Sequence, residues 1–400
     1  MRSTFFNRPA QSLMILMVSP RDTLNALEDH LAANPDDASA WNANGVVLAG
    51  MEMFGDALRS LNQAIQLDPE MSEAHVNRGR VLLALGPEKA KKALKAFERA
   101  LSLSPDDLRI LHDKAQALHI LGRSQDELEC YKRITESLTD EPAVWVRKGD
   151  IELELGRFKA AVASYSHALS LDSNLASALV HQAIALSLQS KWKEAIKSAE
   201  QASKIAPDDV EVWRVLADVS LRAERHRSAM KALKKAYEID PADASIANTM
   251  GMVEYRAGRL KDAVKHFRSA LVRDKKHTSA LRNLGFTLME LEEWAEARTA
   301  WDRLTSIVKN DPDLFDAQAT NYARLEEFCS ASATWERARK LYKKKGDEKE
   351  AERVTRLGRA ARINCSRQKK AAKAERAREK ATRSFSDRFE LRKKKTKGNH

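Results

Sequence analysis

A 34-residue period constrains the fold of this 400-residue chain more than any other feature of its sequence. A small residue marks the same place in nine successive copies of one pattern. These residues are Gly45, Gly79, Ala115, Gly149, Ala183, Ala217, Gly251, Gly285 and Ala319. The interval is 34 residues at every step except one of 36. A fixed period of this length predicts stacked helix–turn–helix repeats, which bury their apolar faces only against their neighbours.

Each repeat carries two stretches of residues with helical periodicity. We number positions from the repeat starts, at residues 38, 72, 108, 142, 176, 210, 244, 278 and 312. Positions 4, 8 and 11 share one face of a first helix, and positions 20, 24 and 27 share one face of a second. Position 8 is small and position 20 is usually alanine, whereas positions 4, 17 and 24 are mostly large. We expect the large residues, which include all seven tryptophans, to fill the core.

This pattern resembles the tetratricopeptide repeat family over about residues 38–345. The resemblance implies an all-α fold, a right-handed α-solenoid of about nine repeats with terminal cap helices and a basic tail. Asp347 followed by Glu350 has the spacing of a helix N-cap. We predict a poorly defined segment at 1–20, a cap helix at 21–37, the repeat array at 38–345, a solvating helix at 346–365 and a disordered basic tail at 366–400.

The third repeat departs from the pattern in its second helix. Glu127 stands at position 20, where alanine is expected, and Ile134 replaces alanine at position 27. One interpretation is a hinge or a locally opened groove. We favour the other, which is sequence drift with Leu128 entering the core one residue later.

The net charge of +12 originates in the C-terminal end of the chain. Residues 341–400 hold 22 Lys and Arg against 8 Asp and Glu, whereas residues 1–340 hold 47 and 49. The end is rich in Lys, Arg and Ala, which predicts disorder because little surface can be buried. Such basic arms bind nucleic acid, ribosomal surfaces or anionic lipid; the alternative is a solvated tail. The candidate polyanion-binding residues are Arg392, Lys393, Lys394, Lys395 and Lys397.

The resemblance also implies where partners bind, because in this family the first helices line a concave groove with positions 2, 5, 9, 12 and 13. Arginines and acids, Asp313 and Asp316 among them, both occupy these positions, which suits a mixed-charge peptide or protein better than a polyanion. The densest group of aromatic, Met and Arg residues, types enriched in interfaces, spans repeats 7 and 8. This groove patch consists of Asn248, Met252, Tyr255, Arg256, Arg282, Phe286 and Met289.

Within the groove patch we expect two kinds of polar contact with a bound segment. Asn248 would hydrogen-bond an extended peptide backbone, and Arg256 with Arg282 would hold a carboxylate. Family members that bind chaperone C-termini use a different arrangement, a clamp of Lys, Asn, Asn, Lys and Arg across three repeats. Here only Asn77 matches that clamp, with Arg109 as a cationic substitute. The sequence therefore predicts against a chaperone-tail receptor.

No catalytic or cofactor motif is found in the sequence. It lacks a Walker loop, a GxGxxG after a strand, GxSxG and HExxH. His112 and His119, with Asp113 nearby, lack a further ligand for a metal site. We therefore predict that the chain is not an enzyme and needs no cofactor.

Cysteine spacing and hydropathy bear on the compartment. Cys130, Cys329 and Cys365 lie far apart and form no CxxC, so we expect neither a disulfide framework nor a zinc site, and we expect a cytoplasmic location. The longest apolar stretch, residues 13–18, is too short for a transmembrane segment. Met14 and Met17 are alternatives to Met1 as the start codon.

These observations favour a non-enzymatic adaptor that binds protein or peptide segments in its concave groove. The alternative is a nucleic-acid- or ribosome-associated factor that contacts a polyanion through the basic tail, with binding that weakens as salt rises. Assembly at a membrane surface through the tail is a third hypothesis with the same charge basis.

Overall fold

The computed structural model describes residues 19–397, with side chains described as far as residue 380. Within this part of the chain there are twenty α-helices, one short 3-10 turn and no strand. The chain divides after Pro207 into two compact halves, which are described separately. The predictions made for residues 1–18, including the alternative start codons, lie outside the described residues.

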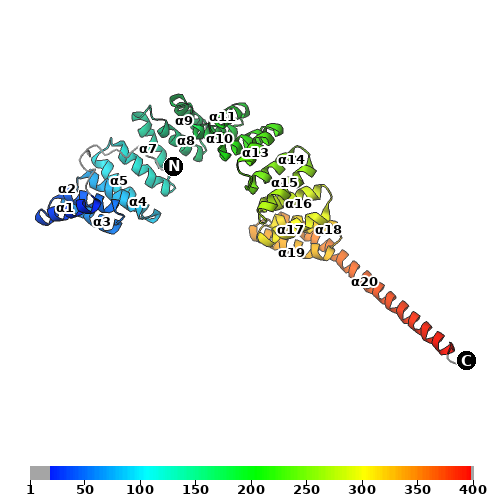
Figure 1. The fold of residues 1–400 in the computed structure, drawn as a ribbon. Coiled ribbons are helices and arrows are strands. Elements are labelled where there is room, and N and C mark those ends of the chain that lie inside the picture. The colour runs from blue at the N-terminus through cyan, green and yellow to red at the C-terminus, as the bar shows by residue number, and fades with distance from the viewer. Residues whose placement is uncertain (1–18, 398–400) are drawn as a thin grey trace. The chain divides into compact units, whose positions relative to one another are not determined.

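The N-terminal half consists of a cap helix followed by five helix pairs (Figure 1). The cap helix is α1 (Pro20–Ala33). The first helices of the pairs are α2 (Ala38–Gly50), α4 (Ser72–Ala84), α6 (Leu108–Ile120), α8 (Pro142–Glu154) and α10 (Ala176–Leu188). The second helices are α3 (Phe54–Leu67), α5 (Ala90–Leu103), which follows the 3-10 turn η1 (Pro87–Lys89), α7 (Ser124–Ser137), α9 (Phe158–Leu171) and α11 (Trp192–Ile205).

The C-terminal half contains four further pairs and one long helix (Figure 1). The first helices are α12 (Val210–Arg222), α14 (Ala244–Arg256), α16 (Thr278–Glu290) and α18 (Pro312–Arg324). The second helices are α13 (His226–Ile239), α15 (Leu260–Arg273), α17 (Trp294–Ile307) and α19 (Phe328–Lys345). The long helix is α20 (Glu348–Lys397). Every first helix begins at the residue at which the sequence places a repeat start.

The turn within each pair depends on a residue with positive φ at position 15. Glycine occupies it in four repeats, and the other five use glutamate or serine. The residues are Glu52, Gly86, Gly122, Gly156, Ser190, Glu224, Gly258, Glu292 and Glu326. Left-handed backbone costs a non-glycine residue about 1 kcal/mol or more, so the packing of the two helices fixes the turn even where the sequence lacks glycine.

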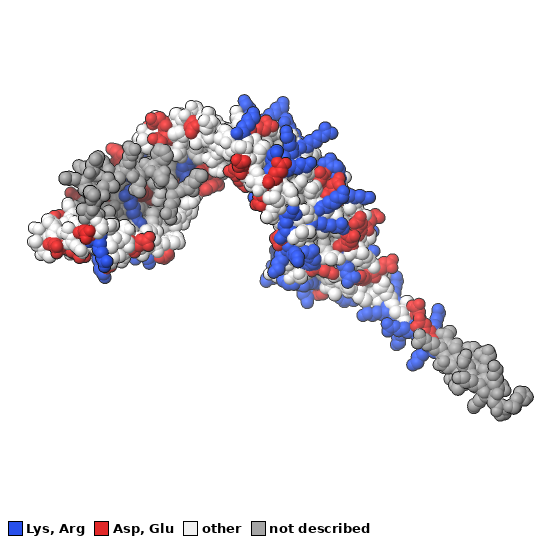
Figure 2. Space-filling view, in the orientation of Figure 1, with Lys and Arg blue, Asp and Glu red and all other residues white. Residues whose placement is uncertain are grey.

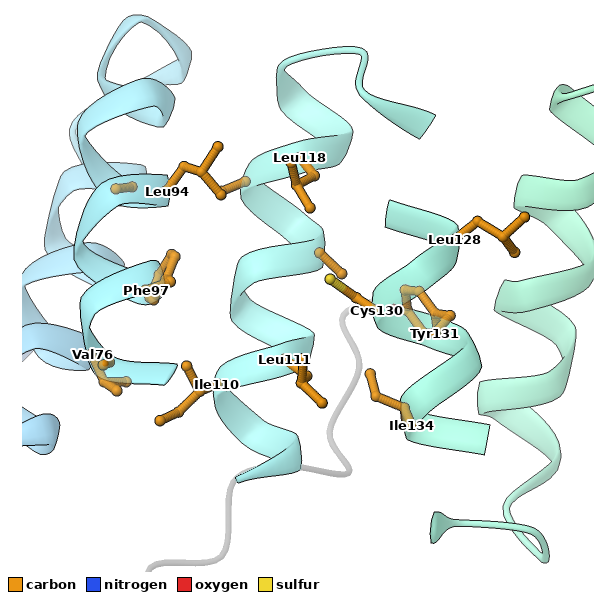
Figure 3. Close-up of a cluster of buried hydrophobic side chains, with 14 of the residues drawn as sticks. Val76, Leu94, Phe97, Ile110, Leu111, Leu118, Leu128, Cys130, Tyr131 and Ile134 are labelled. Atoms are coloured by element: carbon orange, nitrogen blue, oxygen red, sulfur yellow. The ribbon is translucent and has the colours of Figure 1, made fainter. Parts of the chain in front are cut away.

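The core of the third repeat shows how the drift at Glu127 is accommodated. Helix α6 lies between α5 and α7, with Ile110 facing α5 and Leu111 facing α7 (Figure 3). Leu128 is completely buried in this core, as the favoured interpretation expects. Glu127 is buried beside it and forms an ion pair with Arg147 of α8, so its carboxylate connects two neighbouring repeats instead of opening a groove between them.

Tryptophans fill the core less completely than the sequence predicts. Trp301 and Trp335 are buried, whereas the other five are half-buried. The partly exposed rings still serve packing: the indole nitrogens of Trp41 and Trp145 donate to the backbone oxygens of Pro35 and Thr139, each six residues earlier. These rings therefore cover the turns between repeats.

Position 8 is small because the large residue at position 24 of the same repeat lies directly against it. We expect Gly285→Ala to destabilise the protein, because the added Cβ would lie 2.7 Å from Cε2 of the fully buried Trp301. Overpacking of this kind costs about 1–3 kcal/mol, more than the roughly 1 kcal/mol of helix propensity that alanine gains. Gly55→Ala is the control, since nothing lies within 4 Å of its added Cβ. Thermal unfolding measures both; equal stability of the two variants would contradict the expectation.

The C-terminal end differs from the sequence prediction, which placed a helix at 346–365 and a disordered tail after it. Helix α20 continues without a break to Lys397. Its N-cap is the expected one, with the Glu350 amide donating to Asp347 Oδ1 at 3.2 Å. Val354 and Ala361 pack into the core against α19. Once this packed part has formed, each further Lys, Arg, Ala or Glu adds a helical bond at low cost, so the helix propagates.

A disulfide between Cys329 of α19 and Cys365 of α20 corrects the prediction drawn from cysteine spacing. The two residues are 36 apart in sequence, but the antiparallel packing of α19 and α20 brings their Cα atoms to 4.9 Å. Cys130 is buried and free. Disulfides persist in oxidising compartments, so the cysteines no longer support the prediction of a reducing cytoplasm.

Candidate functional site

Four residues of the groove patch come together around one hollow in the C-terminal half. Met252, Tyr255 and Arg256 of α14 and Phe286 of α16 line a hollow of about 290 Å³. Phe267, Asn283 and Thr287 complete its wall. Tyr255 is 40% and Phe286 45% exposed, which is high for two large aromatic side chains on neighbouring helices.

The buried ring of Trp301 supports this hollow from below. Phe286 packs edge-on against it, with ring centroids 4.8 Å apart and planes at 83°. The indole nitrogen of Trp301 donates to Sδ of Met289 at 3.2 Å. Because Trp301 is fully buried, Phe286 and Met289 are fixed by the core while their outer surfaces face solvent. Such preorganisation lowers the entropic cost of binding a partner.

Two residues of the groove patch have contacts that differ from the expected ones. Asn248 is buried, and its side-chain oxygen accepts a hydrogen bond from Asn283 at 3.0 Å, so it is occupied within the protein. Arg282 pairs with Asp311 at 2.9 Å and does not line the hollow with Arg256. Both contacts join one first helix to the next first helix or to its N-cap residue. They depend on how the first helices pack against one another, which could not be predicted from the spacing of the residues in the sequence.

A second, more acidic hollow begins on the other side of Phe286. Its volume is about 400 Å³, and it is lined by Phe286, Met289, Asp313, Asp316, Ala317, Thr320, Tyr342, Glu350 and Arg353. Arg353 of α20 pairs with Asp316 and Glu350, and the Tyr342 hydroxyl donates to Asp313 at 2.6 Å. Burial of the Tyr342 hydroxyl raises its pKa, and the hydrogen bond to the Asp313 carboxylate raises it further.

Sequence reasoning found part of this second hollow and missed the rest. Asp313 and Asp316 occupy groove positions of repeat 9. Glu350 and Arg353 lie beyond the last repeat, where the family pattern assigns no role. The signal that could have found them is the helical spacing of Val354 and Ala361, which pack this helix on the array and so bring Glu350 and Arg353 to the second hollow. At the first hollow, the Glu290 side chain of α16 raises the pKa of Tyr255.

The positions of the chaperone-tail clamp are occupied by internal bonds. Asn77 donates to the side-chain oxygen of Asn42 at 3.0 Å, the same pairing that Asn283 makes with Asn248. Arg109 pairs with Asp107, the N-cap residue of its own helix. Asn77 and Arg109 thus both make contacts within the protein, and the prediction against a chaperone-tail receptor stays a prediction.

The described residues also bear on the other classes of site. Among them, no group of three His, Cys, Asp or Glu is arranged to hold a metal ion. None of the described helices has the length and hydropathy needed to cross a membrane. The tail residues Arg392, Lys393, Lys394, Lys395 and Lys397 belong to α20, but their side chains lie outside the described part of the chain.

Individual relatives match only parts of the chain. Cytochrome c-type biogenesis protein CycH of Rhizobium meliloti (strain 1021) is 28% identical over 134 residues, 32% of this chain and 35% of that protein. DnaJ homolog subfamily C member 7 homolog of Schizosaccharomyces pombe is 25% identical over 187 residues, 43% and 39% of the two chains. This chain thus spans little more than a third of these relatives. The crystal structure of yeast Tom70 has 14% identity and a TM-score of 0.47, covering 87% of this chain and 86% of that one.

Family models agree along most of the repeat array. The cytochrome c-type biogenesis protein H TPR domain matches residues 204–314. Two tetratricopeptide repeat models match residues 142–175 and residues 49–87 and 88–142. Together with the helix pairs and their 34-residue period, these matches extend over more than half of the chain. The chain therefore belongs to the tetratricopeptide repeat family.

Proposed function

We propose that this chain is a non-catalytic adaptor that binds a protein or peptide segment on the first helices of its C-terminal half. As a tetratricopeptide repeat protein it is a protein-interaction scaffold. The finer proposal names the binding surface as α14, α16 and α18, with the hollow at Phe286 as its anchor point.

The observation that carries this proposal is the exposure of Tyr255 and Phe286 around a preformed hollow. A soluble protein seldom exposes two adjacent aromatic side chains over a rigid support unless they contact a partner. Met252 contributes a side chain that adapts to different shapes. An apolar side chain of the partner would therefore enter the hollow and displace its water.

The two hollows on either side of Phe286 differ in charge, which suggests how a bound segment would be oriented. Arg256 borders the first hollow, whereas Asp313, Asp316 and Glu350 outnumber Arg353 in the second. A segment with an apolar residue at Phe286, an acidic residue toward α14 and a basic residue toward α18 complements both ends. Charge complementarity of this kind fixes register more than affinity.

We expect Phe286→Ala to weaken partner binding by about tenfold or more, the usual effect of truncating an interface anchor. The partner is first identified by placing a photo-crosslinking amino acid at position 286 in the native host. Its affinity for wild type and variant is then measured by titration calorimetry.

The matched control is Val272→Ala, which removes apolar surface from a second helix, where Val272 is 77% exposed. If Phe286→Ala and Val272→Ala bind the crosslinked partner as tightly as wild type, the partner does not use this hollow. Unchanged helicity of both variants shows that the array remains folded.

A second candidate function rests on α20. From Arg353 to Lys373 this helix carries eight basic residues and no acidic one. From Ser366 to Lys380 its described side chains are all exposed. A continuous cationic helix fits the alternative of nucleic-acid or ribosome binding. The crosslinking experiment separates the two, because capture at position 286 would survive nuclease and salt, whereas binding to a polyanion would fall steeply with salt.

A further inference from the structure

A second surface of the C-terminal half, next to the groove patch, concentrates positive charge. Residues 222–276 hold 14 Lys and Arg against 7 Asp and Glu, whereas residues 281–340 hold 8 and 11. In the orientation of Figure 1, Lys and Arg gather over α13 and α15 (Figure 2). This surface is formed mainly by second helices and the turns beside them. It is separate from α20 and meets the groove patch at Arg256, which lines a hollow on each surface.

Four arginines of this surface line one open hollow of about 590 Å³, which we call the arginine hollow. Arg225 and Arg227 come from the start of α13, and Arg256 and Arg259 from the end of α14 and the turn after it. Arg259 pairs with Glu254. Within the part of the chain that the structure describes, the guanidinium groups of Arg225, Arg227 and Arg256 have neither an ion pair nor a hydrogen bond. Glu224 is the one carboxylate among the lining residues.

The arginine hollow exists because repeat 6 departs from its neighbours at two positions. Position 17 carries a large apolar residue and position 19 an acid in repeats 5, 7 and 8. The pairs are Trp192 with Glu194, Leu260 with Asp262, and Trp294 with Glu296. Repeat 6 has His226 and Ser228 instead, and both line the hollow. Repeat 6 thus lacks both the large apolar side chain at position 17 and the carboxylate at position 19. Arginines lie on either side of the space where these two side chains would be.

An oxyanion with two charges fits this arrangement better than a single carboxylate. Guanidinium groups bind phosphate through paired N–H donors, and three of them here have no ion-pair partner among the described residues. The Ser228 hydroxyl and the His226 ring add neutral donors, and the first turn of α13 contains no acid to repel an anion. Phe, Tyr and Trp, the usual platforms on which unpaired bases stack, are missing from the lining of the hollow, which argues against single-stranded nucleic acid.

We infer that the arginine hollow binds the phosphate group of a phosphorylated protein segment. Lys231 and Lys234 lie further along α13, Lys261 lies in the first turn of α15, and all three are exposed. In this proposal they contact acidic residues that flank the phosphate. Clusters of arginine recognise phosphorylated and acidic motifs in this way. The site would give the scaffold a second, modification-dependent contact besides the groove patch.

The test uses the full chain and a fluorescein-labelled peptide with one phosphoserine flanked by aspartates, followed by fluorescence anisotropy. The double variant Arg225→Ala/Arg227→Ala is expected to bind at least about tenfold more weakly, since each charge-assisted bond is worth a factor of about this order. The matched control is Lys191→Ala/Lys193→Ala, which removes two positive charges from the same positions of repeat 5, on either side of Trp192. The control is expected to bind as wild type does.

A third variant tests the hollow itself and not only its charge. His226→Trp introduces the residue that repeats 5 and 8 carry at position 17, so the fold tolerates it and the hollow is filled. We expect it to reduce binding as much as the double variant, with unchanged helicity by circular dichroism. Phe286→Ala is expected to leave phosphopeptide binding unaltered, which keeps this result independent of the groove patch.

Three results would overturn the inference. The double variant could bind the phosphopeptide as tightly as wild type. The serine version of the peptide could bind equally well, which would show that the phosphate is not recognised. A DNA duplex could bind more tightly than the phosphopeptide and lose affinity in the double variant, which would make the surface a nucleic-acid contact.

Discussion

Replacing Arg147 with alanine is expected to destabilise the N-terminal half by about 3–5 kcal/mol, the usual cost of removing one partner from a buried ion pair. Arg147 Nη2 lies 2.6 Å from Oε1 of Glu127, whose side chain is only 1% exposed. His119 lies 3.3 Å from the other carboxylate oxygen and is half exposed. Without Arg147, the carboxylate would remain in the core between α7 and α8 with His119 as its remaining partner among the contacts described. Urea unfolding followed by circular dichroism measures the change.

The repeat pattern supplies the control for this result. All eight other repeats have alanine at the position of Glu127, in repeat 2 after its two-residue insertion, so Glu127→Ala both restores the usual small residue and removes the buried charge. Arg147 can then turn toward solvent, because it is already 32% exposed. We therefore expect Glu127→Ala to cost much less than Arg147→Ala, and the double variant to recover most of the lost stability. Equal effects of the two single variants, or no recovery in the double variant, would contradict the assignment of a buried charge as the cause.

Removing the Cys329–Cys365 disulfide is expected to destabilise the packing of α20 on α19 by about 3–4 kcal/mol, from the chain entropy released when a loop of this length is opened. The loop contains the second half of the last repeat and the packed start of α20, and the sequence separation of the two cysteines is 36 residues. The effect is local, since solenoid repeats contact only their neighbours. Hydrogen exchange of residues 348–365 in the Cys329→Ser/Cys365→Ser variant measures it directly.

Cys130→Ala serves as the control for thiol chemistry, because Cys130 is free and lies in the core of repeat 3. Adding a reductant to wild type is expected to increase hydrogen exchange in α20 as much as the Cys329→Ser/Cys365→Ser substitutions do. The Cys130→Ala protein is expected to show the same exchange in α20 as wild type, both with and without reductant. Equal protection of α20 with and without reductant would show that core contacts such as Val354 hold the helix alone. Detecting Cys329 and Cys365 as free thiols in the native host would support the cytoplasmic location that the sequence suggested.

The repeat starts, the helix pairs and the family followed from the sequence, because they depend on interactions between residues close along the chain. The 34-residue period places apolar residues at helical spacing, and glycine or a short polar turn ends each first helix. Position 8 is small in every repeat, and the contact of Gly285 with Trp301 shows the space that this leaves for position 24. The groove patch also depended on this regularity, so Met252, Tyr255, Arg256 and Phe286 could be assigned to one surface.

The failures of sequence reasoning all involve contacts between different repeats or beyond the last one. Asn248 was expected to face a ligand, but it bonds to Asn283 of the next repeat. Arg282 pairs with Asp311 across a similar distance along the chain. The helical tail, with Glu350 and Arg353 at the second hollow, lies where the repeat pattern no longer applies.

What the sequence by itself determined is the periodic part of this protein: the helices, their pairing and the sides of them that are buried. These properties arise from a repeating pattern in which each residue interacts mainly with others three, four or about sixteen positions away. The tertiary structure alone decided which polar groups neutralise one another, as for Glu127 with Arg147, and which cysteines meet, as for Cys329 with Cys365. Such pairs form only when separate helices pack at a particular register, and residue spacing carries no information on that register.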